Sequence, residues 1–115
     1  MTESHPADMG LDAVRAARAR IRDAVRHTPL QRSDWLSEAA GVPVYLKLEC
    51  WQRTGSFKFR GAMHAVSLLD ETDDRPLVTA SAGNHGLALA LAADLHGRTA
   101  TVFVPETAPA TKRAR

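Results

Sequence analysis

The stretch LVTASAGNHGLALALAADLHGRTATVFV, residues 77–104, decides the fold. It opens with the short apolar run LVTA, which is typical of a buried strand, and continues through the glycine-containing turn SAGNHG. Residues 87–96 are rich in alanine and leucine, which indicates a buried helix that Gly97 ends, and residues 99–104 predict a second strand. Strand, helix and strand in this order predict a parallel βαβ unit with a right-handed crossover.

Three helices are expected before this unit. Apolar residues at steps of three and four predict an amphipathic helix over residues 11–25. Ser33 and Gly41 bracket a short helix, because serine caps helix starts and glycine ends helices. Ser56 caps a third helix that reaches about residue 69. Residues 70–76, which are acidic and contain proline, are the best linker candidate.

One strand is also expected in the first half of the chain, over residues 42–48. Its apolar side chains alternate with Tyr45, Lys47 and Glu49, which predicts one buried face or a position near a sheet edge. With the two later strands it would form a three-stranded parallel sheet, so the predicted fold class is α/β. Residues 105–115 begin another predicted helix, and so small a sheet would leave strand edges uncovered. We therefore expect an incomplete α/β unit.

Composition excludes several classes of function. The 115 residues carry a formal net charge of +2 with the basic residues spread along the chain, so no nucleic-acid partner is expected. No apolar run approaches the roughly 18 residues of a membrane span, and residues 1–10 show no signal-peptide segment, so a cytoplasmic protein without a membrane partner is expected. Cys50 is the single cysteine, which excludes an internal disulfide, and we expect a buried or partly buried thiol. No metal site is expected, because neither the cysteine nor the histidines have the spacing of zinc ligands.

Lys58 is unusually placed, in the first turn of the helix that follows Ser56. The positive end of the helix dipole disfavours a cation there, and burial by Phe57 and Phe59 would act in the same direction, so the amine should lose its proton more readily than most. Such an amine suits Schiff-base chemistry. The alternative is a lysine that extends to water from an ordinary amphipathic helix, and this segment alone favours that alternative.

A second candidate segment is TASAGNHG, residues 79–86, where a strand runs through a glycine turn into a helix. Such a turn presents backbone N–H groups and the helix dipole to an anion, and ligands bind at this end of parallel strands. Ser81, Asn84 and His85 add side-chain hydrogen-bonding groups, so a carboxylate or phosphate is the expected ligand. Local caps explain Ser81 and Asn84 equally well.

Together these segments resemble one known family. The runs YLKLE at 45–49, QRTGSFKFRGA at 52–62 and ASAGNHG at 80–86 resemble the tryptophan-synthase-β-like enzymes, the fold type II group that uses pyridoxal 5′-phosphate (PLP), and within it the serine/threonine dehydratases. The resemblance extends from about His27 to the end of the chain and includes VPETAP at 104–109. An ordered set of motifs is a far stronger signal than a lone glycine motif.

The resemblance implies a role for each candidate residue. Lys58 would hold PLP through a Schiff base and act as the base at the substrate α-carbon. Phe57 would pack against the cofactor, and Asn84 would hydrogen-bond the 3′-hydroxyl of PLP. The carboxylate of an amino acid substrate would be bound by Ser81, Gly83, Asn84 and His85.

The implied reaction is β-elimination from L-threonine or L-serine, which yields a 2-oxo acid and ammonia. Related racemases often carry a second serine at the position of Ala82, so alanine there favours elimination. Threonine synthase, racemases, diaminopropionate-type ammonia-lyases, ectoine-pathway dehydratases and cysteine-synthase relatives share these motifs. A fragment that binds nothing is an alternative of a different class.

The resemblance also implies an organisation larger than this chain. Residues 1–70 would belong to a larger PLP-binding domain and residues 71–115 to part of a smaller α/β domain, with Lys58 and residues 81–85 on opposite walls of a cleft. The family's phosphate-gripping loop and the residue at the pyridine nitrogen lie further downstream, so the isolated chain is expected to be inactive. Cys50 stands where the family often has asparagine, which should tune packing near the cofactor. The full-length protein is expected to be a homo-oligomer.

Overall fold

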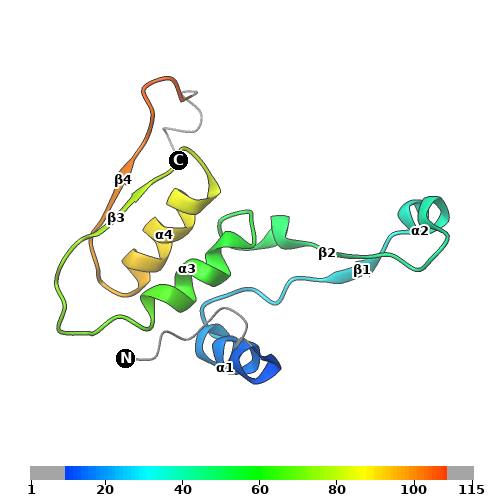
Figure 1. Ribbon diagram of the computed structural model, residues 1–115, viewed down its shortest axis with the longest axis horizontal. Coiled ribbons are helices and arrows are strands. Elements are labelled where there is room, and N and C mark those ends of the chain that lie inside the picture. Colours follow the sequence, from blue (N-terminus) through cyan, green and yellow to red (C-terminus); the bar gives the residue numbers. More distant parts are fainter. Residues whose placement is uncertain (1–9, 109–115) are drawn as a thin grey trace.

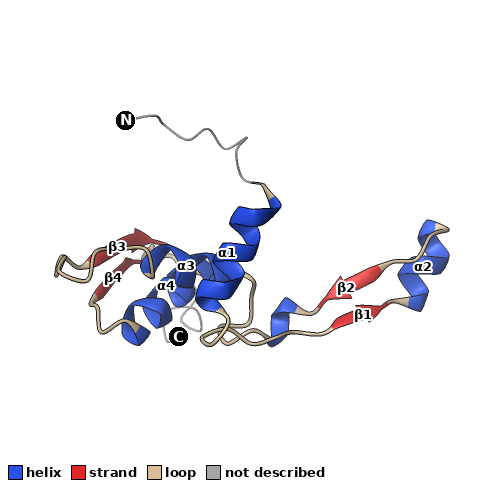
Figure 2. Ribbon diagram, turned by 90° about the horizontal axis from the view of Figure 1, so that it is seen from below, coloured by secondary structure: helices blue, strands red, loops and turns tan. Residues whose placement is uncertain are grey.

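The computed structural model describes residues 10–108, which form a helical body and a projecting arm (Figures 1 and 2). The body contains the helices α1, α3 and α4 and the strands β3 and β4, and the arm contains β1, α2 and β2. In chain order the elements are α1 (Leu11–Ile21), β1 (Leu30–Arg32), α2 (Asp34–Ala40), β2 (Tyr45–Lys47), the 3₁₀ helix η2 (Glu49–Trp51), α3 (Lys58–Val66), β3 (Leu77–Ala80), α4 (Asn84–Leu95) and β4 (Ala100–Phe103).

The predicted βαβ unit is present in the body. Strands β3 and β4 pair in parallel, from Leu77 opposite Ala100 to Ala80 opposite Phe103. Helix α4 connects them and packs against both strands. It begins at Asn84, three residues earlier than predicted, because residues 84–86 form the first turn of the helix and do not belong to the preceding glycine turn. The α/β fold class is confirmed.

The predicted three-stranded parallel sheet is wrong. Strand β2 pairs antiparallel with β1, a strand that the sequence pattern did not predict, and the two form a separate sheet in the arm. Strand β2 covers only three residues of the predicted 42–48, and all three are exposed. Of the two positions expected for it, a strand with one buried face or a strand near a sheet edge, the edge position is observed, because both strands of a two-stranded sheet lie at an edge. The physical reason is proximity along the chain. Only residues 33–44, which contain α2, separate β1 from β2, so pairing these two strands costs less loop-closure entropy than bringing β2 to the distant strands β3 and β4.

The caps predicted for α2 are confirmed. The Ser33 hydroxyl accepts a 3.3 Å hydrogen bond from the Leu36 N–H, and Gly41 ends the helix with a φ of 71°, a left-handed conformation that favours glycine. The Ser37 hydroxyl accepts a 2.9 Å hydrogen bond from the Val44 N–H, which joins α2 to the chain that leads into β2. The arm is therefore held together by its own backbone and serine hydrogen bonds.

The core lies where α3 crosses α4 and α1. Helix α3 buries side chains at steps of three and four, and α4 supplies alanines that let the two helices approach closely. Helices α1 and α3 end at Ile21 and Val66, a few residues earlier than predicted, and Val25 packs against the core from the turn after α1. The buried cluster consists of Ile21, Phe59, Ala62, Met63, Val66, Ala88 and Ala92.

The predicted linker, residues 70–76, is a loop fixed by short-range hydrogen bonds. The Asp70 carboxylate accepts from the Thr72 N–H at 2.8 Å, and the Asp73 carboxylate accepts from the Arg75 N–H at 3.1 Å. Arg98, just before β4, donates to the carbonyl oxygen of Asp73. Of the helix predicted from residue 105, only residues 105–108 are described, and they form a turn. None of the helices within residues 10–108 is long and apolar enough to cross a bilayer.

Candidate functional site

Lys58 is the first residue of α3, and its side chain is exposed. The Nζ atom lies 5.3 Å from the centroid of the Phe57 ring, within the range of a cation–π contact. The prediction that Ser56 caps this helix is wrong, because the helix begins one residue later than such a cap requires: Phe57 is the N-cap, and no side chain caps α3. The Ser56 hydroxyl accepts a 3.4 Å hydrogen bond from the Lys58 N–H in the turn that precedes the helix. The expected burial of Lys58 between two aromatic rings is wrong, because Phe57 is 61% exposed and Phe59 is fully buried in the core. The amine is open to the solvent.

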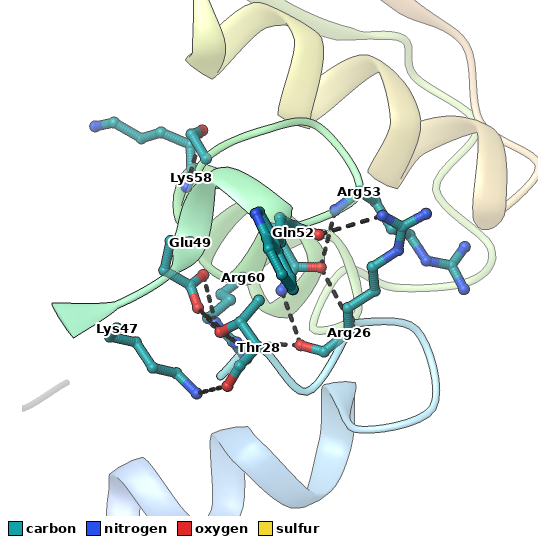
Figure 3. A network of polar contacts seen from close by, with 10 residues as sticks. Arg26, Thr28, Lys47, Glu49, Gln52, Arg53, Lys58 and Arg60 are labelled. Carbon is teal, nitrogen blue, oxygen red and sulfur yellow. Dashed lines mark hydrogen bonds and ion pairs between the residues drawn. The ribbon is translucent and has the colours of Figure 1, made fainter. Parts of the chain in front are cut away.

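A network of polar side chains holds the same turn of α3 (Figure 3). The Arg60 guanidinium donates two hydrogen bonds to the Glu49 carboxylate, 2.9 Å from Nε to Oε2 and 2.8 Å from Nη2 to Oε1. The Thr28 hydroxyl also donates to this carboxylate, and Lys47 Nζ donates to the Thr28 carbonyl oxygen at 2.6 Å. The Arg60 hydrogen bonds, helped by Thr28, lower the pKa of Glu49 from 4.5 to about 2, although burial opposes them.

Gln52 fixes the loop between η2 and α3. Its side chain is buried, its Oε1 atom accepts a 2.9 Å hydrogen bond from the Arg26 N–H, and its Nε2 atom donates to the Arg26 carbonyl oxygen at 3.0 Å. The amide therefore pairs with both backbone groups of one residue, as a neighbouring strand would. The nearby Cys50 is exposed, so the expectation of a buried or partly buried thiol is wrong, because η2 is a single surface turn.

The start of α4 is open to an anion. Gly83 is its N-cap, and no side chain caps the helix among the described residues. The Ser81 hydroxyl accepts a 3.2 Å hydrogen bond from the Gly83 N–H, whereas the N–H groups of the first turn have no acceptor within the helix. Gly86 lies against β3 and β4, and a Cβ atom there would be 2.8 Å from Val102 Cγ1 and 3.2 Å from the Ser81 carbonyl oxygen. Asn84 and His85 are exposed beside it.

The two candidate segments lie at the same end of the body. Helices α3 and α4 pack on each other, and in Figure 1 both run from the upper right to the lower left, so their first turns point the same way. One segment offers an amine with an aromatic ring beside it, and the other offers free N–H groups at a helix start. These groups fit PLP and a carboxylate substrate, because the aldehyde of PLP requires an amine and a carboxylate requires such donors.

The sequence indicates Lys58 and the turn at residues 81–85, but it does not reveal the polar network that holds the first turn of α3. Glu49, Gln52 and Arg60 belong to the motifs that carry the resemblance, but the sequence indicates no role for them, nor for Thr28. The network joins segments more than twenty residues apart, so no local period reveals it. The one available signal was a glutamate, a glutamine and an arginine close to a candidate lysine.

Known proteins resemble this chain over most of its length. A family described as pyridoxal-phosphate dependent enzyme matches residues 21–115. A catabolic L-threonine dehydratase of Staphylococcus aureus is 45% identical over 107 residues, which cover 91% of this chain and 31% of that protein. A serine racemase of Oryza sativa subsp. indica is 40% identical over 96% of this chain and 33% of its own length. The solved structure of maize serine racemase superposes with a TM-score of 0.81 at 40% identity and covers 90% of this chain and 32% of that structure. The chain thus spans about a third of the length of these relatives.

Proposed function

Because the chain belongs to the family of pyridoxal-phosphate dependent enzymes, we propose that it forms the part of such an enzyme that holds PLP through Lys58. The proposed reaction is β-elimination from L-threonine or L-serine to a 2-oxo acid and ammonia. The 45% identity to a threonine dehydratase supports this choice of reaction. The observation that carries the proposal is the exposed Lys58 amine at the start of α3, at the same end of the body as the uncapped start of α4.

Each residue at this end would have a distinct task. Bound PLP would supply an electron sink for the bond that breaks at the substrate α-carbon. Lys58 would hold the cofactor covalently, and its amine, once released, would remove the α-proton. The Phe57 ring, which already lies beside the amine, would pack against the flat cofactor ring. Asn84 would hydrogen-bond the 3′-hydroxyl group.

The start of α4 would orient the substrate through its carboxylate. In the structure the Ser81 hydroxyl accepts from the Gly83 N–H, and a bound carboxylate would take hydrogen bonds from both groups. The N–H groups of Asn84 and His85 would complete the set, and the positive end of the helix would favour the negative charge. Binding there would fix the α-carbon next to Lys58.

Racemisation is the second candidate, since serine racemases are 40% identical to this chain. A racemase requires a group that returns a proton to the face of the α-carbon opposite the lysine. Between Ser81 and Gly83 this chain carries Ala82, whose methyl group cannot donate a proton. Ala82 therefore favours elimination.

The whole enzyme would contain more than this chain, which spans about a third of its relatives. We propose that residues 1–70 and 71–115 contribute to two domains joined by the loop at 70–76, and that the complete enzyme is a cytoplasmic homo-oligomer with an amino acid as substrate. We also propose that the chain alone is inactive, because the parts that would grip the PLP phosphate and ring nitrogen lie downstream in this family.

The proposal is tested by mixing the purified chain with PLP, recording the visible absorption band, and reducing with borohydride before peptide mapping. The chain has three lysines, and we expect labelling at Lys58 to be much stronger than the background labelling at Lys47 and Lys112. Lys58→Ala should remove the visible band, and Lys112→Ala is the matched control that should keep it. Equal labelling of all three lysines would contradict the proposal.

The reaction itself is tested on the longer protein that contains this chain. With L-serine or L-threonine we expect a 2-oxo acid and ammonia as the main products, measured by chromatography. D-serine as the main product would instead identify a racemase.

A further inference from the structure

We propose that the Glu49–Arg60 ion pair is a positioning device for Lys58, which fixes the first turn of α3 so that the amine projects in one direction. The inference rests on the proposed function, because it concerns the lysine that would hold PLP. It adds a role for two residues that touch neither the cofactor nor the substrate in that proposal.

Lys58 and Arg60 project from opposite sides of the first turn of α3 (Figure 3). Arg60 follows Lys58 by two residues, and side chains two apart on a helix point to opposite sides. Figure 3 shows this arrangement, with Lys58 directed away from the side where Arg60 meets Glu49. Two parallel hydrogen bonds from a planar guanidinium fix orientation as well as distance. The helix start is thus held on the side where Arg60 contacts Glu49, while the Lys58 side chain on the other side is free to react (Figure 3).

The loop at residues 52–57, which leads into Lys58 at the start of α3, is held at both ends. Before the loop, the Thr28 hydroxyl donates to Glu49. After the loop, Arg60 Nη2 donates to the Arg26 carbonyl oxygen at 3.2 Å and to Thr28 Oγ1 at 3.4 Å. Both ends of the loop are therefore attached to residues 26–28. A loop fixed at both ends on one segment has few ways to move the helix start that follows it, and Lys58 with it.

The Glu49–Arg60 ion pair is partly buried. The Glu49 side chain is 16% exposed and that of Arg60 is 31% exposed, whereas every other ion pair within residues 10–108 has at least one partner that is 84% exposed or more. Exposed pairs are screened by water and salt and impose little geometry, whereas a partly buried pair is screened less and is more rigid. The pair is therefore suited to holding a neighbouring residue in place.

The test measures the geometry of Lys58 without measuring turnover. The chain and its variants are incubated with PLP, and two quantities are recorded: the induced circular dichroism of the visible band, and the ratio of borohydride labelling at Lys58 to that at Lys112. For Glu49→Gln, which keeps the side-chain shape, we expect the ratio to fall about tenfold and the induced signal to vanish, because small displacements of a reacting group have large effects. Arg60→Gln should do the same, and the double variant should be no worse than either single variant.

Two further variants keep the test decisive. Asp73→Asn breaks the Asp73–Arg75 ion pair, which is remote in sequence from the site, and should leave both quantities unchanged. If far-ultraviolet circular dichroism shows that Glu49→Gln does not fold, Arg60→Lys is used in its place. Lysine keeps the positive charge but cannot make the bidentate contact with the Glu49 carboxylate. For Arg60→Lys we expect the labelling ratio to fall about threefold.

The outcomes separate the two proposals. If the unaltered chain is labelled at Lys58 but folded Glu49→Gln keeps the ratio and the induced signal, with only a lower unfolding midpoint, the pair is structural and the inference is overturned. If the unaltered chain is not labelled at Lys58, the proposed function fails, and the inference fails with it.

Discussion

Glu49 illustrates how a single side chain couples stability to pH. Its carboxylate accepts hydrogen bonds from the Arg60 guanidinium and the Thr28 hydroxyl, which favour the charged form and lower its pKa from 4.5 to about 2. A pKa that is lower in the folded state than in the unfolded state contributes stability above the unfolded value. That contribution is lost as the pH falls through the folded value. The relevant window is therefore between about pH 4.5 and pH 2.

We expect Glu49→Gln to lower the free energy of unfolding by about 2 kcal/mol at pH 7, because the charged Arg60 then lacks its partner in a partly buried place. The difference between the variant and the unaltered chain should shrink as the pH falls toward 2, where Glu49 itself becomes protonated. Urea unfolding at several pH values, followed by far-ultraviolet circular dichroism, measures this difference. A difference that stays constant with pH would show that the carboxylate charge is not its source.

At the scale of elements, two helical glycines have opposite surroundings. Gly86 in α4 lies so close to β3 and β4 that a Cβ atom would meet Val102 and Ser81 at 3.3 Å or less. Gly61 in α3 is exposed, and a Cβ atom there would meet nothing within 4 Å. Close packing makes glycine necessary at the first position, whereas at the second glycine only weakens the helix.

Gly86→Ala should lower the free energy of unfolding by about 2 kcal/mol, because the start of α4 must move away from the strands. Gly61→Ala, the matched control, should raise it by about 0.5–1 kcal/mol, because alanine favours the helix and restricts the unfolded chain. Thermal and urea unfolding of both variants measure these changes. Equal effects of the two substitutions would mean that the contact between α4 and the strands is looser than the structure shows.

At the scale of the whole molecule, large apolar side chains remain at the surface of the described residues. On the face of the β3–β4 sheet away from α4, Val78 is 60% exposed and Phe103 is 62% exposed, and in the arm Trp35 is 75% exposed. Parallel sheets are normally covered on both faces, and a large exposed apolar surface marks a place where something else packs. The isolated chain should therefore be prone to associate.

We expect the purified chain to bind a hydrophobic dye such as anilinonaphthalene sulfonate and to elute from a sizing column at a volume that depends on concentration. The double variant Val78→Gln and Phe103→Gln should reduce dye fluorescence about twofold without lowering the unfolding midpoint, because neither side chain is buried. Phe59→Gln is the contrasting variant, since Phe59 is fully buried and its replacement should unfold the chain. Unchanged dye binding in the double variant would show that the dye binds another exposed apolar surface, and the arm would be the next region to test.

The sequence by itself determined the features that depend on neighbouring residues. The order of apolar runs, glycine turn and alanine-rich segment in residues 77–104 predicted the parallel βαβ unit. Ser33 and Gly41 predicted both ends of α2, and the ordered motifs around Lys58 and Ser81 predicted the family. Turns, caps and helix faces follow from local sterics and hydrogen bonding, so a single sequence is enough to locate them.

Only the tertiary structure decided which distant segments meet. Strand β2 pairs with β1 and not with the parallel sheet, and Lys58 is exposed where burial by Phe57 and Phe59 was expected. The side chains of Glu49, Gln52 and Arg60 join the turn after α1 to the start of α3. These contacts depend on how hydrophobic surfaces and polar groups compete for partners across the whole chain. A side chain that serves a partner more than twenty residues away carries no local pattern, so its role becomes visible only in three dimensions.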